Sequence, residues 1–252
     1  MIALSVNLNK IALIRNSRPG NFPDLVAHGR QCLDAGAQGL TVHPRPDQRH
    51  VRPRDVRDLA PLCAGFSGVE FNVEGNPFAK PTGEYPGLLA LVMEARPHQC
   101  TLVPDSNDQL TSDHGFDLTR DGDRLEPVIS ALKAANIRVS LFMDPDLEQI
   151  SLARELGADR IELYTGPYAW AAAQQSPDLE RIFAAHCAAA EHALQLGLGV
   201  NAGHDLNLLN LPRYRSLPGL QEVSIGHALT VDALNMGLEN AVYAYLRCLS
   251  GD

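Results

Sequence analysis

Apolar residues gather in eight short runs along the chain, each bounded by polar residues, glycine or proline. Their residues are mostly Val, Ile and Leu, and the runs are too short for typical helices, so each one predicts a β-strand. The eight predicted strands cover residues 2–8, 39–43, 69–74, 99–104, 137–143, 160–166, 198–204 and 222–227.

Between the predicted strands, apolar residues recur three and four positions apart, and Gly or Asn often ends the pattern. This spacing is typical of amphipathic helices. The predicted helices cover 24–37, 54–65, 87–96, 124–136, 146–156, 178–197 and 230–249, with a weaker candidate near 207–216.

Strand and helix therefore alternate eight times, which favours a parallel sheet covered by helices. We expect a (β/α)₈ barrel, a TIM barrel. An open, doubly wound sheet is the alternative, but the segment after the first strand, "NKIALIRNSRPG", lacks the glycine-rich phosphate signature of that fold. Because no linker or low-complexity tract interrupts the pattern, we expect one domain over residues 1–252.

Composition and charge restrict the function classes. The formal net charge is −9, and no basic stripe is visible, which argues against a nucleic-acid partner. No apolar run reaches the length of a membrane-spanning helix, and the N-terminus lacks the features of a secretory signal. The five cysteines are scattered and form no CxxC pair, so we expect reduced thiols and a cytoplasmic protein.

Polar and titratable residues stand at nearly every predicted strand end. In a (β/α)₈ barrel the active site lies at the carboxyl ends of the strands. The candidates are Asn7, Asn9, His43, Arg45, Asn72, Glu74, Thr101, Asp144, Glu162, Thr165, Asn201, His204, Gly226 and His227. This distribution indicates an active site at that end of the barrel.

The stretch "TVHPRPDQRH" concentrates cationic and titratable groups after the second strand. His43 and Arg45 are two positions apart and share one side of an extended segment, and Arg49 and His50 follow. A phosphate or carboxylate ligand would account for the cluster.

Glu74 ends the third strand on the same face as Glu70 and Asn72. A carboxylate that points into a barrel mouth is a candidate general base with a perturbed pKa. A salt bridge at the barrel rim is the alternative reading.

Two Gly-His pairs, Gly203-His204 and Gly226-His227, end the seventh and eighth strands. Barrels often bind phosphate on the backbone of the loops after these strands, where glycine permits close approach. The long polar segment 103–123 after the fourth strand is a candidate lid. Because no HxH, HExxH or CxxC pairing occurs, we expect no catalytic metal.

Eight segments in order carry a family resemblance: "VNLNKIALIRNSR", "GLTVHPRPDQRH", "FNVE", "CTLVP", "RVSLFMD", "IELYTG", "GVNAGH" and "IGHAL". Together they resemble the pyridoxine 5′-phosphate synthase family of vitamin B6 biosynthesis. The resemblance implies a barrel with extra helices, assembled as a homo-octamer, a tetramer of dimers. It also implies condensation of two phosphorylated small molecules, 1-deoxy-D-xylulose 5-phosphate and 3-amino-2-oxopropyl phosphate, with loss of phosphate and water and without a cofactor.

The resemblance also implies roles for single residues. His43 and Glu74 would accept protons, His204 would donate one, and Glu162 would stabilise a transition state. The remaining implied residues bind substrate: Asn7, Arg18, Gly226 and His227 for the aminoketone phosphate, and Arg45, His50 and Thr111 for the deoxyxylulose phosphate.

The chain departs from the family pattern at two places. Asn9-Lys10 stands where many members have Asp-His, and Asp205 stands where many have Gly. We expect Asn9 and Lys10 to remain substrate contacts. Asp205 would repel a bound phosphate unless its side chain points away, although its backbone N–H stays available. We therefore expect Asp205→Gly to tighten phosphate binding and to leave turnover nearly unchanged.

Two other functions stay open at this stage. A phosphosugar aldolase or epimerase would require a Schiff-base lysine at a strand end or a metal site, and neither Lys10 nor Lys133 is well placed for the former. A non-catalytic phosphosugar-binding barrel is the other alternative, supported only by the two departures.

The missing metal-ligand motifs generate a first prediction. We expect dialysis against a strong chelator to leave the condensation activity within about twofold of its starting value, because titratable side chains can perform the proton transfers. Loss of activity on chelation, followed by recovery with zinc, would contradict the prediction.

Overall fold

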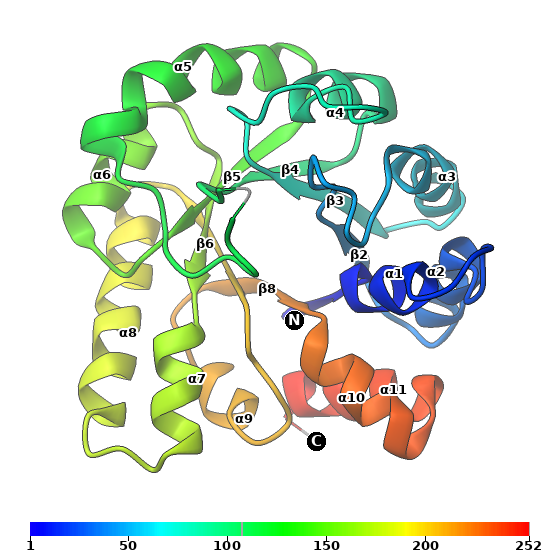
Figure 1. Cartoon of the computed structure of the whole chain (residues 1–252). Coiled ribbons are helices and arrows are strands. Elements are labelled where there is room, and N and C mark those ends of the chain that lie inside the picture. The colour runs from blue at the N-terminus through cyan, green and yellow to red at the C-terminus, as the bar shows by residue number, and fades with distance from the viewer. Residues whose placement is uncertain (107, 252) are drawn as a thin grey trace.

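The computed structural model describes residues 1–106 and 108–251, within which eight parallel strands close into a barrel surrounded by helices (Figure 1). Each strand pairs with the next one in sequence, and the last pairs with the first, Ala3 opposite Glu222. The strands are β1 (Ala3–Asn7), β2 (Gly39–Val42), β3 (Glu70–Gly75), β4 (Gln99–Leu102), β5 (Arg138–Met143), β6 (Arg160–Tyr164), β7 (Gly199–Gly203) and β8 (Leu220–Ile225). The predicted (β/α)₈ barrel is confirmed.

The helices pack around the outside of this barrel (Figure 1). They are α1 (Asn9–Asn16), α2 (Leu25–Asp34), α3 (Pro53–Ala64), α4 (Leu88–Ala95), α5 (Leu118–Ala134), α6 (Leu147–Glu155), α7 (Gly166–Ala173), α8 (Leu179–Gln195), α9 (Leu211–Tyr214), α10 (His227–Met236) and α11 (Leu238–Ser250). Aspartates begin three of them: the side chains of Asp24, Asp117 and Asp146 accept hydrogen bonds from backbone N–H groups of the first turn.

Three helical segments differ from the sequence prediction. The sequence predicts a strand over 2–8 and no helix directly after it, but α1 follows β1 after one residue, with Ile11, Ala12 and Arg15 buried on its inner face. The Ala-rich α7 was not predicted. The predicted helix 230–249 is two helices, because Gly237 lies between them with φ of 84°, outside the helical region.

The barrel interior is largely polar. Successive side chains of a strand point to opposite sides, so Leu4 and Val6 face the helices while Ser5 faces the barrel axis. Inward residues bond across strands: the Ser5 and Thr41 hydroxyls lie 2.7 Å apart, and the Thr101 hydroxyl donates to Asn72 Oδ1 at 3.1 Å. The apolar core therefore lies mainly between the strands and the surrounding helices.

A buried ion pair fixes α1 to the first turn of α3, and further bonds from α1 reach the segment between β2 and α3. Arg15 is fully buried, and its guanidinium reaches both carboxylate oxygens of Asp55, at 2.5 and 2.8 Å. Arg15 Nη2 also donates to the carbonyl of His50 at 3.1 Å. The Asn16 side-chain amide donates to the carbonyls of Gln48, Arg49 and His50 at 2.8–3.2 Å. These bonds position the segment that carries Arg45 and His50.

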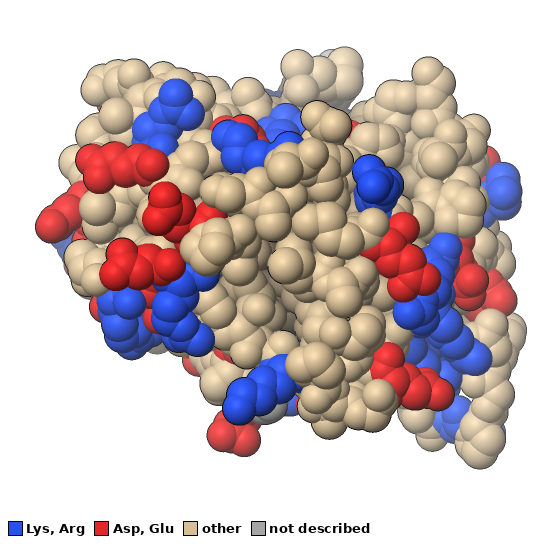
Figure 2. All heavy atoms as spheres, turned by 90° about the horizontal axis from the view of Figure 1, so that it is seen from above, with Lys and Arg blue, Asp and Glu red and all other residues tan. Residues whose placement is uncertain are grey.

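Charges are intermixed on the surface. On the face shown in Figure 2, Lys and Arg side chains lie beside Asp and Glu side chains. Among residues 1–106 and 108–251, no helix is long and apolar enough to cross a membrane. All five cysteines are free, and Cys32, Cys63 and Cys100 are buried.

The Arg15–Asp55 pair generates a stability prediction. Asp55→Ala leaves a buried guanidinium without its counter-charge, and we expect the free energy of unfolding to fall by about 3–5 kcal/mol in urea titrations. Glu94→Ala is the matched control, because Glu94 pairs with Arg57 on the exposed surface, where ion pairs contribute little. Similar losses in the two variants would contradict the prediction.

Candidate active site

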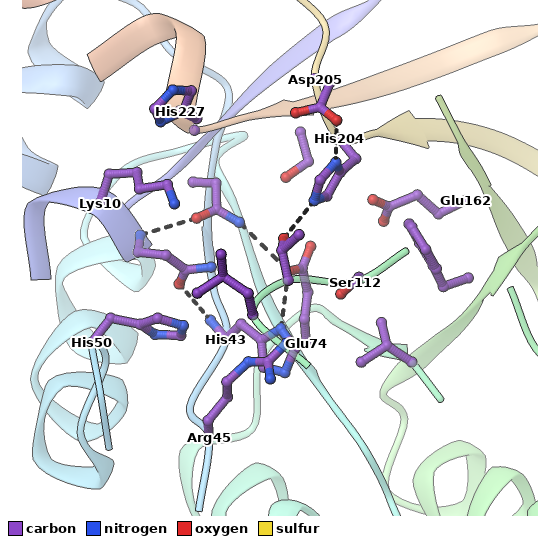
Figure 3. A pocket seen from close by; sticks show the side chains of 18 residues that line it. Lys10, His43, Arg45, His50, Glu74, Ser112, Glu162, His204, Asp205 and His227 are labelled. Atoms are coloured by element: carbon purple, nitrogen blue, oxygen red, sulfur yellow. Dashed lines mark hydrogen bonds and ion pairs between the residues drawn. The ribbon is translucent and has the colours of Figure 1, made fainter. Parts of the chain in front are cut away.

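A cavity of about 280 Å³ lies at the carboxyl ends of the strands. Figure 3 shows the labelled side chains around one common space, with His204 and Asp205 on one side and His43, Arg45 and Glu74 on another. The predicted residues that line the cavity are Asn7, Asn9, Lys10, His43, Arg45, His50, Glu74, Thr111, Glu162, His204, Asp205, Gly226 and His227. Arg18 does not line it and is exposed beyond the end of α1.

The first turn of α1 joins two strand ends. Asn7 Oδ1 accepts a hydrogen bond from the backbone N–H of Asn9 at 3.0 Å. Asn9 Oδ1 in turn accepts one from the backbone N–H of His43 at 2.9 Å. Because α1 begins directly after β1, it carries Lys10 to the cavity as well. The Asn9-Lys10 departure therefore lies within the site.

His43 lies between two carboxylates. Its Nδ1 is 4.0 Å from Glu74 Oε2, and its Nε2 is 3.9 Å from Asp105 Oδ2. Burial, followed by the charges of Arg45 and His50, holds the pKa of His43 well below its usual value. The imidazole is therefore neutral at neutral pH, and its contact with Glu74 is not a salt bridge.

Two glutamates at the barrel mouth, Glu74 and Glu162, have raised pKa values. Burial and the nearby charge of Glu162 raise the pKa of Glu74 well above its usual value. Burial and the charge of Glu222 raise the pKa of Glu162 to about 8. Among the described residues Glu74 lies within 4.0 Å of the neutral His43 ring and forms no salt bridge with an arginine, so this geometry gives no support to the rim salt-bridge reading.

Arg45 is fixed by the segment that follows β4. Its guanidinium pairs with Asp105 and donates to the carbonyl of Gln109 at 3.0 Å. The Ser112 hydroxyl donates to the same Asp105 carboxylate at 2.9 Å. Sequence reasoning missed Asp105 and Ser112. Asp105 follows Pro104 directly, and ending the predicted strand at residue 102, as the structure does, would have indicated it.

His204 lies across the cavity, at the end of β7. Its Nε2 is 2.7 Å from Thr111 Oγ1, and its Nδ1 is 2.8 Å from Asp205 Oδ2. Thr111 belongs to the predicted lid segment, which therefore contacts residues on both sides of the barrel mouth. Gly203 permits this packing, because a Cβ at its position would collide with the Glu162 carboxylate.

The N-terminus of α10 points toward the same cavity. Gly226 precedes the helix, His227 is its first residue, and both line the cavity. A Cβ on Gly226 would lie 3.0 Å from the Asn7 side chain. The backbone N–H groups and the partial positive charge of a helix N-terminus suit an anion such as phosphate.

A closed parallel barrel with buried acids, neutral imidazoles and cationic groups at its carboxyl end defines an acid–base enzyme of the TIM-barrel class. Comparison with known proteins gives the family. A sequence model of the family "Pyridoxal phosphate biosynthesis protein PdxJ" matches residues 4–251. The chain belongs to this family, and the expected resemblance is confirmed.

Relatives with assigned names are similar over almost their whole length. Pyridoxine 5′-phosphate synthase of Xanthomonas campestris pv. campestris (strain B100) is 56% identical over 251 residues, which cover 98% of this chain and 96% of the relative. The protein of the same name from Albidiferax ferrireducens is 51% identical and covered to 97%.

A solved structure supports the fold alone. The tryptophan synthase alpha chain of Legionella pneumophila subsp. pneumophila superimposes with a TM-score of 0.66 at 12% identity. The match covers 99% of this chain and 91% of the other.

The raised pKa of Glu162 generates a prediction about stability and pH. The folded state keeps this proton up to about pH 8, whereas the unfolded state loses it near 4.5, so wild-type stability falls as the pH rises through this window. Glu162→Gln cannot titrate. The quantity to compare is the free energy of unfolding of Glu162→Gln minus that of wild type. We expect this difference to become more positive by on the order of 3 kcal/mol as the pH rises from about 5 to about 9.

Urea titrations at several pH values measure this difference. The exposed Glu126→Gln serves as the control and should follow the wild-type profile. A constant offset between Glu162→Gln and wild type at every pH would contradict the prediction.

Proposed function

We propose that this chain forms pyridoxine 5′-phosphate from 1-deoxy-D-xylulose 5-phosphate and 3-amino-2-oxopropyl phosphate, with loss of inorganic phosphate and water. The observation that carries the proposal is the meeting of His43, Glu74, Glu162 and His204 around one cavity, in a chain whose relatives bear the name of that synthase.

The chemistry fits the protonation states of these groups. Joining an amine to a ketone, removing water and closing an aromatic ring need repeated proton transfers and no redox step. Neutral His43 can accept a proton, and buried Glu74, whose pKa is raised, can hold one and release it when a nearby charge changes. A cationic amine in the cavity would favour the Glu74 carboxylate and make it the second acceptor.

His204 and Glu162 would act on the other side of the substrate. His204 reaches the cavity through Nε2, the atom from which it would donate a proton. Glu162 Oε2 lies 3.4 Å from the Thr101 hydroxyl, and the residue is buried in the barrel mouth, where it would stabilise a transition state. We propose that none of these steps needs a cofactor or a metal ion.

Two regions of the cavity would hold the two phosphates. The deoxyxylulose phosphate would bind to Arg45, His50 and Thr111, and Arg45 would supply the positive charge. Burial and the charge of Arg45 lower the pKa of His50 to about 3, so the His50 ring is neutral. Asn7 and the Gly226-His227 backbone would bind the aminoketone phosphate, with Asn9 and Lys10 beside them. Arg18 could join only if the segment after α1 moved toward the cavity.

We further propose that the barrel is a homo-octamer, a tetramer of dimers, that acts in the cytoplasm without nucleic-acid or membrane partners. Exposed apolar side chains on neighbouring helices support an assembly: Leu13 and Ile14 on α1 and Leu234 on α10, which is 77% exposed. Free thiols suit a reducing compartment. Sedimentation analysis tests the assembly.

Incubation of the purified protein with both substrates tests the activity. Release of inorganic phosphate together with the absorbance of pyridoxine 5′-phosphate is expected only when both substrates are present. An aldolase or epimerase would act on one phosphosugar alone, and a non-catalytic barrel would bind without releasing phosphate.

Glu74→Gln tests the acid–base assignment. Gln preserves size and hydrogen bonding but cannot carry the proton, so we expect turnover to fall at least about a hundredfold. Steady-state kinetics and a urea titration together separate this effect from a loss of folding. A folded Glu74→Gln protein with near-normal turnover would remove Glu74 from the mechanism.

A further inference from the structure

Asp205 contacts the ring of His204 at the nitrogen opposite the one that Thr111 contacts. Asp205 Oδ2 lies 2.8 Å from Nδ1, and the opposite ring nitrogen, Nε2, lies 2.7 Å from Thr111 Oγ1. A carboxylate can only accept, so Nδ1 carries a hydrogen. We infer that Asp205 is a positioning residue, which holds His204 with Nε2 toward the substrate and favours its proton-donating form.

The backbone at this turn is held in an unusual conformation. His204 and Asp205 both have positive φ, 82° and 56°, which favours glycine over residues with a Cβ. The Thr165 hydroxyl donates to the carbonyls of Gly203 and His204, and the Asn210 amide donates to the carbonyl of Asp205 at 3.1 Å. The turn is therefore fixed by several bonds, and the Asp205 carboxylate adds an interaction where the backbone alone would favour glycine.

The charges around the pair keep Asp205 ionised. The hydrogen bond from His204, and then the positive charges of His204, His227 and Lys10, lower the pKa of Asp205. His227 approaches from the start of α10 and Lys10 from α1. A carboxylate that accepts from one ring nitrogen orients an imidazole and, as a general rule, stabilises its cation over its neutral form.

The other neighbours of His204 supply less charge. Tyr164 packs edge-on against the ring, with centroids 5.5 Å apart. Burial and the charges of Asp205, Asp113 and Asp144 raise the pKa of Tyr164, so its phenol is neutral. The Asp113 carboxylate pairs with His114 at 2.5 Å. Asp205 is thus the carboxylate with a direct bond to the His204 ring.

This geometry favours a different outcome from the one expected from sequence. There, removal of Asp205 was expected to tighten phosphate binding and spare turnover. A carboxylate that is bonded to His204 and close to Lys10 and His227 is already compensated. Its loss should therefore impair proton donation more than it changes phosphate affinity.

The test rests on the proposed synthase reaction and uses the full chain with three variants. For Asp205→Gly we expect kcat to fall about tenfold, KM for each substrate to stay within about twofold, and the alkaline limb of the kcat/KM profile to move about one unit to lower pH. Asp205→Asn supplies a neutral hydrogen-bond acceptor for His204. Its kcat should therefore lie between those of Asp205→Gly and wild type, while the alkaline limb of its kcat/KM profile should stay at the lower pH. Asp113→Asn, the control, should leave the limb in place.

A double-mutant comparison shows whether the effect passes through His204. In the His204→Asn background, Asp205→Gly should cost less than about twofold further in kcat. The inference would be overturned by any of three results: an equal loss of kcat in both backgrounds, an unshifted alkaline limb in Asp205→Gly, or tighter phosphate binding with unchanged kcat.

A readout without turnover separates this inference from the proposed function. Diethyl pyrocarbonate modifies neutral imidazole, and peptide mass spectrometry can follow His204 alone. The pH of half-maximal modification should fall in Asp205→Gly but not in Asp113→Asn. An inactive wild type would refute the synthase proposal and leave this result standing, whereas identical modification profiles would refute the role of Asp205.

Discussion

The polar side chains inside the closed barrel need hydrogen-bond or charge partners, and the rest of the structure depends on how this need is met. Every second strand residue faces the axis, where few partners other than neighbouring strands are available. On strand β8 an acid lies beside a cation, Glu222 at 3.5 Å from Arg160. Near the carboxyl ends Thr101 bonds Glu162, but Glu74 has no paired cation among the described residues. Burial in this interior therefore supplies protonated acids at the carboxyl end of the barrel.

The sequence predicted the barrel because strand and helix patterns alternate with clear breakers between them. It failed where two elements share one apolar stretch. Ile11 and Ala12 continue the apolar character of β1, and α1, with eight residues, is short for a helical periodicity to be recognised. Gly237 within residues 230–249 was readable as a helix break, but the helical periodicity on both sides concealed it.

The candidate site was predictable where residues follow strand ends, as His43 and His204 do. Contacts between distant segments were not. The pairing of Arg45 with Asp105 joins two loops 60 positions apart, and the direction of the Asp205 carboxylate depends on backbone angles that a single sequence does not reveal. Arg18, taken from the family resemblance, lies outside the cavity and remains a prediction.

The bonds from Arg15 and Asn16 to the carbonyls of residues 48–50 have a thermodynamic consequence. They hold the backbone around His50 by contacts within the protein itself, so a ligand that binds there need not supply the conformational entropy of arranging that loop. Binding on this side of the cavity is therefore preorganised by a contact in the protein core. Selection for affinity and selection for a stable fold act here on the same two side chains.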